Sequence, residues 1–266
     1  MTIIAAGSAG AIAVNEKSRA RLTKEACVCV AADERRVACI GEKNALLFSG
    51  DGAFAFSPPP GVSRAFFHGD SLYALSSDGD GVYRLSAGTG EPLVFSPAGC
   101  FPRDFALSPC GRYIAVAGGA GGETAVLEAD SLRLVCVRRL PGAAMGARFF
   151  KGCLYVLCRG EGDEAALYAL KKGNAVLRRA FSDAPCALGV CAGCLAAGFP
   201  GKLMLLNADG RALRAFECAL PLRITDAPGG ALVVDALEER VFRLSPRGAA
   251  AVWAAPVEPL DAAVVF

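Results

Sequence analysis

Histidine and tryptophan are nearly absent from this chain of 266 residues, which contains one of each, His68 and Trp253. A single imidazole excludes metal motifs that need two histidine ligands. The formal net charge is only +2, so the chain lacks the strongly basic balance of a typical nucleic-acid-binding protein. Charged residues make up 20% of the chain and hydrophobic residues 53%, a balance that excludes intrinsic disorder.

A secretory signal is not expected either, because the apolar residues 1–6 lack a preceding basic segment. The twelve cysteines are therefore expected to be reduced thiols in a cytoplasmic protein. Most of them have apolar neighbours, where cysteine behaves as a small hydrophobic residue. The redox state of Cys191 and Cys194, which flank a two-residue turn, stays open.

Short apolar segments recur with a period of about 40 residues, and this repeat predicts the architecture. Five segments that follow a polar or glycine-containing turn are 72–75, 113–116, 154–157, 195–197 and 232–234. Each is preceded by another apolar run and followed by a third and a fourth, as in 82–85 and 93–95. Residues 27–56 contain a further copy of the pattern. Four antiparallel strands per repeat are typical of a propeller blade.

The two ends of the chain complete a seventh blade. Residues 262–266 read as a first strand with nothing after it, whereas 2–5, 11–14 and 19–22 read as second, third and fourth strands. Joining them closes the ring and removes an open sheet edge. The sequence therefore predicts one all-β domain, 1–266, a seven-bladed propeller with blades at approximately 1–26 plus 260–266, 27–62, 63–100, 101–141, 142–183, 184–220 and 221–259.

Residues 105–116, Phe-Ala-Leu-Ser-Pro-Cys-Gly-Arg-Tyr-Ile-Ala-Val, resemble the "SPDGRYLYV" hairpin of WD40-like and YVTN/lactonase-like seven-bladed propellers. The Gly-His and Trp-Asp dipeptides of true WD40 repeats are missing, so the chain is more similar to the irregular bacterial group. That resemblance implies a fold rather than an activity, because the group contains lactonases, dehydrogenase subunits and many binding proteins.

The segments leading into the first strands carry a recurring arginine. In propellers, ligands usually meet the face formed by these segments and by the loops between second and third strands. The candidate binding residues are Arg64, Arg103, Arg148 and Arg223, accompanied by Asp104, Asp226 and Asp261. Guanidinium groups around one channel mouth could hold a carboxylate, a phosphate or an acidic peptide. The alternative is that they are solvated or form salt bridges across blades, and a register slip of one residue would change which way they face.

Other motifs fit turn chemistry better than catalysis. Asp78 and Asp80 lie in an acidic loop that lacks EF-hand spacing. Residues 69–72 spell Gly-Asp-Ser-Leu, but within a hairpin rather than the strand-to-helix context of a hydrolase. No metal ligand set and no catalytic set are assigned.

These observations favour a non-enzymatic binding or scaffold propeller that presents a ligand-binding or protein-binding face at the mouth of its central channel. The alternative is a lactonase-like hydrolase or another small-molecule enzyme at the same place, and a cofactor-dependent dehydrogenase subunit is a third interpretation. We expect no cofactor, an unknown protein or a small anionic ligand as partner, no nucleic acid, no membrane, and a monomer in the cytoplasm.

Overall fold

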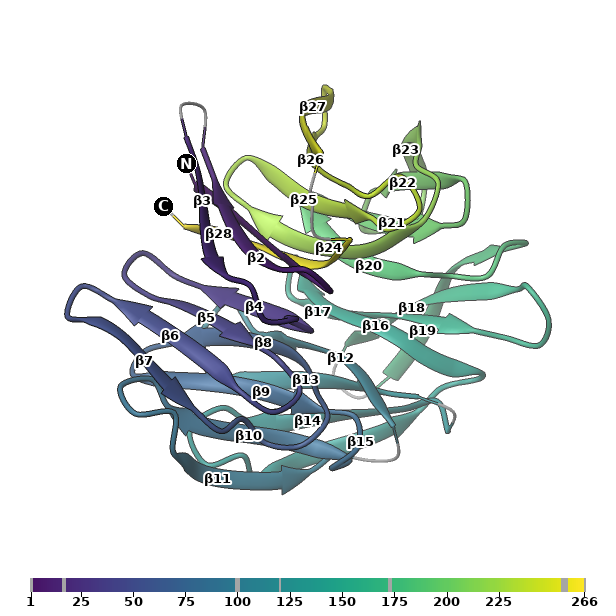
Figure 1. Cartoon of the computed structure of the whole chain (residues 1–266). Coiled ribbons are helices and arrows are strands. Elements are labelled where there is room, and N and C mark those ends of the chain that lie inside the picture. The colour runs from purple at the N-terminus through teal and green to yellow at the C-terminus, as the bar shows by residue number, and fades with distance from the viewer. Residues whose placement is uncertain are drawn as a thin grey trace.

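The computed structural model describes residues 2–15, 18–98, 101–119, 121–171, 174–254 and 258–265, and side chains of these residues outside 249–254. In this part of the chain, 28 strands form seven four-stranded antiparallel sheets (Figure 1). The predicted all-β, seven-bladed propeller is therefore confirmed. Cys100 and Phe266, which the sequence interpretation includes, lie outside the described residues.

Blade 1 combines both termini, as predicted. Strand β28 (Pro259–Val265) pairs with β1 (Thr2–Gly7), which pairs in turn with β2 (Gly10–Val14), and β3 (Arg19–Thr23) is outermost. The N and C labels lie beside each other on this blade in Figure 1. Because β1 and β28 pair within one sheet, the first and last repeats are joined by strand pairing.

The other six blades each use four consecutive strands, innermost strand first. Blades 2 to 4 are β4 (Cys29–Ala32), β5 (Val37–Ile40), β6 (Ala45–Ser49), β7 (Gly52–Phe56); β8 (Val62–His68), β9 (Ser71–Ser76), β10 (Gly81–Ser86), β11 (Pro92–Pro97); and β12 (Pro102–Leu107), β13 (Tyr113–Gly118), β14 (Glu123–Glu128), β15 (Leu134–Arg139). Blades 5 to 7 are β16 (Ala143–Phe150), β17 (Cys153–Arg159), β18 (Ala165–Lys171), β19 (Asn174–Phe181); β20 (Ala187–Cys191), β21 (Cys194–Phe199), β22 (Lys202–Leu206), β23 (Ala212–Glu217); and β24 (Pro221–Ala227), β25 (Gly230–Asp235), β26 (Arg240–Ser245), β27 (Gly248–Ala254).

The innermost strands form a closed ring around a central channel. Strands β28, β4, β8, β12, β16, β20 and β24 each contact the next in this cyclic order, and β24 contacts β28. Second strands such as β9 and β17 lie between two other strands and between neighbouring blades, so they are buried along almost their whole length. This double burial explains why they read as continuous apolar runs rather than as alternating patterns.

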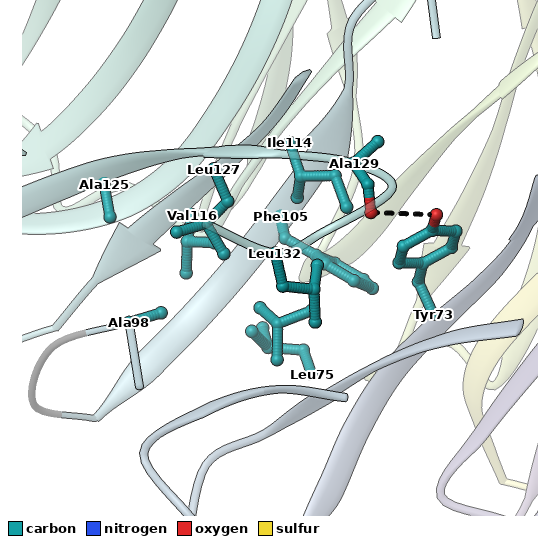
Figure 2. Close-up of a cluster of buried hydrophobic side chains, with 11 residues drawn as sticks. Tyr73, Leu75, Ala98, Phe105, Ile114, Val116, Ala125, Leu127, Ala129 and Leu132 are labelled. Carbon is teal, nitrogen blue, oxygen red and sulfur yellow. Dashed lines mark hydrogen bonds between the residues drawn. The ribbon is translucent and has the colours of Figure 1, made fainter. Parts of the chain in front are cut away.

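The hydrophobic core lies between blades. Figure 2 shows the cluster in which Tyr73 and Leu75 of blade 3 pack against Ile114 and Leu127 of blade 4. The Tyr73 hydroxyl donates a hydrogen bond to the Ala129 carbonyl at 3.1 Å, in the turn between the third and fourth strands of the next blade. Such bonds satisfy the polar end of a buried ring.

The same device recurs two blades further on. The Tyr155 hydroxyl donates to the Ala208 carbonyl at 2.7 Å, again in the next blade's third-to-fourth turn. Both tyrosines follow a leucine in the second strand of their blade. Blades 3 and 5 therefore share this contact as well as the order of their strands. None of the described segments forms a helix that is long and apolar enough to cross a membrane.

Candidate functional site

A shared irregularity of the innermost strands places charged side chains at the channel. The pairing register between first and second strands shifts near the start of the first strand in blades 1, 3, 4, 5 and 7. A β-bulge of this kind re-aims the side chain that follows it. The residues directly after the shift are Asp261, Arg64, Asp104, Gly146 and Arg223. Four of the predicted site residues therefore occupy equivalent positions.

Arg103 does not join them. It is the extra residue of the bulge in β12, and its side chain is exposed. Alignment by spacing matches Arg103 with Arg64, but strand pairing matches Asp104 with Arg64. The one-residue difference is large because consecutive strand residues face opposite ways.

Asp104 is the centre of the cluster and is completely buried. Its carboxylate accepts backbone N–H groups of Phe105 at 3.0 Å and Ala147 at 3.3 Å. It also pairs with Arg64 Nη1 at 3.0 Å and with Arg148 Nη1 at 2.5 Å. Three neighbouring blades thus meet at one carboxylate, and two of the four predicted arginines form salt bridges across blades.

The two arginines bound to Asp104 differ in electrostatic balance. Burial lowers the pKa of Arg148, but the carboxylates of Asp104 and Asp226 more than compensate, so its pKa is raised. Burial and the neighbouring Arg223 lower the pKa of Arg64 to about 10, and Asp104 only partly opposes them. The Arg64 Nε is buried and has no hydrogen-bond partner among the residues that the structure describes. Positive charge around Arg64 is therefore incompletely compensated.

Arg223 reaches across the channel. Its Nη2 donates to the Ser63 carbonyl of blade 3 at 3.3 Å, although two blades separate blades 7 and 3 in the ring. No carboxylate among the described residues lies within ion-pair distance of it. Asp261 instead accepts the backbone N–H groups of Val30 at 3.1 Å and Ala262 at 3.0 Å. Burial raises the pKa of Asp261, and the nearby arginines oppose that rise.

Two glycines make room for this arrangement. A Cβ on Gly146 would lie 3.2 Å from the Asp104 Oδ2 and 2.9 Å from the Leu188 Cβ. A Cβ on Gly189 would lie 2.2 Å from the Ile224 Cγ2. Real Cβ atoms essentially never come within 3.0 Å of another heavy atom, as both added Cβ atoms would, so the innermost strands of blades 5 to 7 depend on both glycines for their spacing.

Two hollows lie on either side of this charged layer. The first, about 610 Å³, lies on the side formed by the inter-blade segments and the second-to-third loops, here called the inter-blade face. Its lining includes Arg223, Leu260 and Lys43, which comes from the loop between β5 and β6. The sequence predicts a binding site on this face. It does not identify Lys43 as part of that site, because only its position in a second-to-third loop distinguishes this lysine from others.

The second hollow, about 340 Å³, lies on the side of the first-to-second hairpins and is called the axial cavity. Arg64, Arg148, Asp226 and Asp261 line it, together with apolar residues from the later halves of the innermost strands. Asp226 accepts the Val190 backbone N–H at 3.0 Å. Partial desolvation by the surrounding protein raises the pKa of Asp226, against the lowering influence of Arg148. The predicted residues are therefore divided between two sides of the layer rather than gathered at one mouth.

Three large apolar side chains are exposed around the inter-blade face. They are Phe101, Leu237 and Leu260, which are 63%, 71% and 38% exposed. Phe101 has a φ of +54°, an uncommon conformation for a bulky residue, and its N–H donates to the Asp80 Oδ1 at 2.9 Å. Unfavourable backbone conformations that are held by specific contacts concentrate at functional sites.

The remaining sequence motifs have ordinary structural roles. Cys191 and Cys194 lie opposite each other in the β20–β21 hairpin without a disulfide. All eleven cysteines in the described ranges are free thiols. Burial raises the pKa of Cys191 to about 11, so it is protonated near neutral pH. Within the described residues, no group of three or more His, Cys, Asp or Glu side chains is placed to hold a metal ion.

Comparison with known proteins gives the fold. The sequence matches no protein-family model and no curated protein. Among solved structures, it is similar to hydrazine synthase of Kuenenia stuttgartiensis (TM-score 0.75, 10% identity, 88% of each chain). It is also similar to a protein of Bacteroides fragilis proposed to be a 6-phosphogluconolactonase (0.74, 10%, 100% of this chain and 98% of that one). The Neurospora crassa Pan2 WD40 domain aligns with a TM-score of 0.63 at 14% identity, over 84% of this chain and 77% of that one. The fold is thus that of the lactonase-like and WD40-like propellers, which include enzymes and binding domains alike.

Proposed function

We propose that this protein is a non-enzymatic binding propeller whose inter-blade face binds an acidic segment of a protein partner. The observation that carries the proposal is the 610 Å³ hollow, whose lining includes the half-buried Arg223 and the exposed Lys43, with the exposed carboxylates of Glu42 and Asp78 beside them. Arg223 has no ion-pair partner in the described part of the chain, so its guanidinium is available to a carboxylate. Guanidinium groups bind carboxylates with two parallel hydrogen bonds when access allows.

Exposed apolar side chains on the inter-blade face support a protein rather than a free anion as the partner. Leu260 lines the hollow, Leu237 lies in the second-to-third loop of blade 7, and Phe101 leads into blade 4. Protein interfaces combine apolar or aromatic anchors with a polar rim, and most of their binding energy comes from a few such anchors. A small anion would make no use of these three side chains.

The test uses exposed residues, because Arg64 and Arg148 hold the ring together and their removal would confound folding with binding. The double variant Lys43→Glu/Leu237→Asp changes the proposed face. The matched control, Lys151→Glu/Leu213→Asp, makes the same charge and polarity changes at exposed positions away from it.

Tagged wild type and both variants would be used for capture from native extract, followed by measurement of the dissociation constant for the captured protein. We expect a partner that binds wild type and the control alike and is lost with the Lys43/Leu237 variant. Equal capture by all three proteins would contradict this location for the site. Binding of small dicarboxylates that is stronger than binding of any protein would replace the protein partner by a small anionic ligand.

The alternative, a lactonase-like hydrolase or another small-molecule enzyme, is favoured by one observation. Asp226 faces the axial cavity with a raised pKa, as a general acid or base requires. Turnover of lactone substrates by purified wild type, and its loss in Asp226→Asn, would favour this alternative over a binding protein.

A further inference from the structure

The axial cavity lies on the opposite side of the charged layer from the proposed protein-binding face. It contains about 340 Å³, a volume suited to a small molecule rather than to a folded segment. Its lining is mostly apolar and comes from the later halves of the innermost strands, including Ala65, Ala106 and Ala262. A concave apolar site with a few fixed polar groups is the usual form of a small-molecule site.

The polar groups of the cavity carry both signs of charge. Arg64 and Arg148 supply two guanidinium groups, and Asp226 and Asp261 supply two carboxylates. Asp104 binds Nη1 of each arginine, and Arg148 also donates from Nη1 to the Ala147 carbonyl and from Nη2 to the Ile224 carbonyl. Arg64 Nη2 has no hydrogen-bond partner among the described residues, so Arg64 offers more free N–H groups to a ligand than Arg148 does. A simple anion would meet two carboxylates in this cavity, and a simple cation would meet two guanidinium groups.

The acidic side of the cavity has one accessible acceptor. Asp226 Oδ1 accepts the Val190 N–H, whereas Oδ2 has no hydrogen-bond donor among the described residues. Asp226 is an exposed residue and lines the cavity. Asp261, by contrast, is buried and uses both oxygens on backbone N–H groups. The free carboxylate oxygen therefore belongs to Asp226.

We propose that the axial cavity binds a small zwitterion, an α-amino acid with an apolar side chain. Its carboxylate contacts the guanidinium groups of Arg64 and Arg148, and its ammonium contacts the Asp226 carboxylate. Its side chain packs against the apolar lining of the cavity. A ligand with both charges satisfies both sets of groups at once, and buried polar groups left unpaired would lower the affinity of an analogue that lacks either charge.

The experiment is isothermal titration of the purified full chain with L-phenylalanine and L-leucine. Two analogues of phenylalanine, 3-phenylpropionate without the ammonium and 2-phenylethylamine without the carboxylate, test the need for each charge. We expect at least one amino acid to bind, and both analogues to bind on the order of tenfold or more weakly.

Two variants locate the site. Asp226→Asn is isosteric and keeps the Arg148–Asp104 pair, and it is expected to weaken amino-acid binding roughly ten- to a hundredfold. Ala106→Leu fills the cavity without changing its charge and is expected to abolish binding. Asp78→Asn, at the hollow on the other face, is the control and leaves the affinity unchanged. Circular dichroism and thermal unfolding confirm that each variant is folded.

Three results would overturn the proposal. The first is that wild type binds neither amino acid at about 10 mM, a concentration at which even weak binding would be measured. The others are analogues that bind as tightly as the amino acids, and undiminished binding in both cavity variants. The amino-acid titration tests the axial cavity independently of the protein-binding proposal. Lys43→Glu/Leu237→Asp changes the inter-blade face alone and is expected to bind the amino acids as wild type does.

Discussion

Replacing Asp104 by asparagine tests whether the channel arginines are part of the framework. The substitution keeps the shape of the side chain but removes the charge shared by Arg64 and Arg148. Both guanidinium groups would remain largely buried, with 12% and 9% of their side-chain surfaces exposed. Breaking a buried ion pair by removing one partner typically costs about 3–5 kcal/mol, because an uncompensated charge is left in the interior.

That cost corresponds to a measurable change in thermal stability. An unfolding entropy of about 2.1 cal/mol/K per residue, applied to 266 residues, converts about 3–5 kcal/mol into a fall of about 5–9 °C in Tm. Urea unfolding followed by circular dichroism would give the free energy of unfolding, and calorimetry would give Tm.

The control is Asp183→Asn, which removes an ion pair of 2.7 Å with Lys202 at an exposed site. Solvent and salt screen such pairs, so Tm should remain near that of wild type. Arg103→Ala should also leave Tm unchanged, because Arg103 is exposed and forms no salt bridge in the described part of the structure. A loss below about 1 kcal/mol in Asp104→Asn would show that water compensates the two arginines, and it would refute the framework role.

Three further predictions concern packing, pH and a polar contact. Gly189→Ala should lower the free energy of unfolding by about 1–3 kcal/mol in urea, because the added Cβ overlaps Ile224. Burial raises the pKa of Asp235, but backbone N–H groups and its other hydrogen-bond partners lower it below the ordinary 3.8. Its contribution to stability is therefore present above pH 3.8 and is lost as the pH falls through the lower folded pKa. The difference in the free energy of unfolding between wild type and Asp235→Asn should shrink in acid unfolding curves. Tyr155→Phe should cost about 0.5–1.5 kcal/mol, since it removes the donor to the Ala208 carbonyl.

Each of these has an outcome that would contradict it. Gly50→Ala is the control for the packing variant, because no atom of the described residues lies within 4 Å of the added Cβ. Equal losses in both variants would exclude overlap as the cause. An Asp235→Asn variant whose deficit is constant with pH would mean that this carboxylate is not favoured in the folded state. An unchanged free energy of unfolding in Tyr155→Phe would show that water replaces the hydroxyl.

Much of the candidate site could be named from sequence, but its grouping could not. Arg64, Asp104, Arg148, Arg223 and Asp261 all lie on innermost strands, as the position of each before or within an apolar run indicated. Spacing alone also suggested Arg103, because a bulge adds one residue without a visible change in composition. The exposed apolar residues of the inter-blade face carried no pattern, since loops lack the periodicity that marks strands.

The sequence by itself determined the number of blades, the four strands in each and the shared terminal blade. These features depend on local turns and on apolar runs that repeat along the chain, so they can be read without knowing any distant contact. Only the tertiary structure decided which charged residues meet. Asp104 joins residues 40 and 44 positions away, and Arg223 bonds to a carbonyl 160 positions away. Those contacts depend on the ring closing and on the register after each bulge, and a shift of one residue turns a side chain to the opposite face.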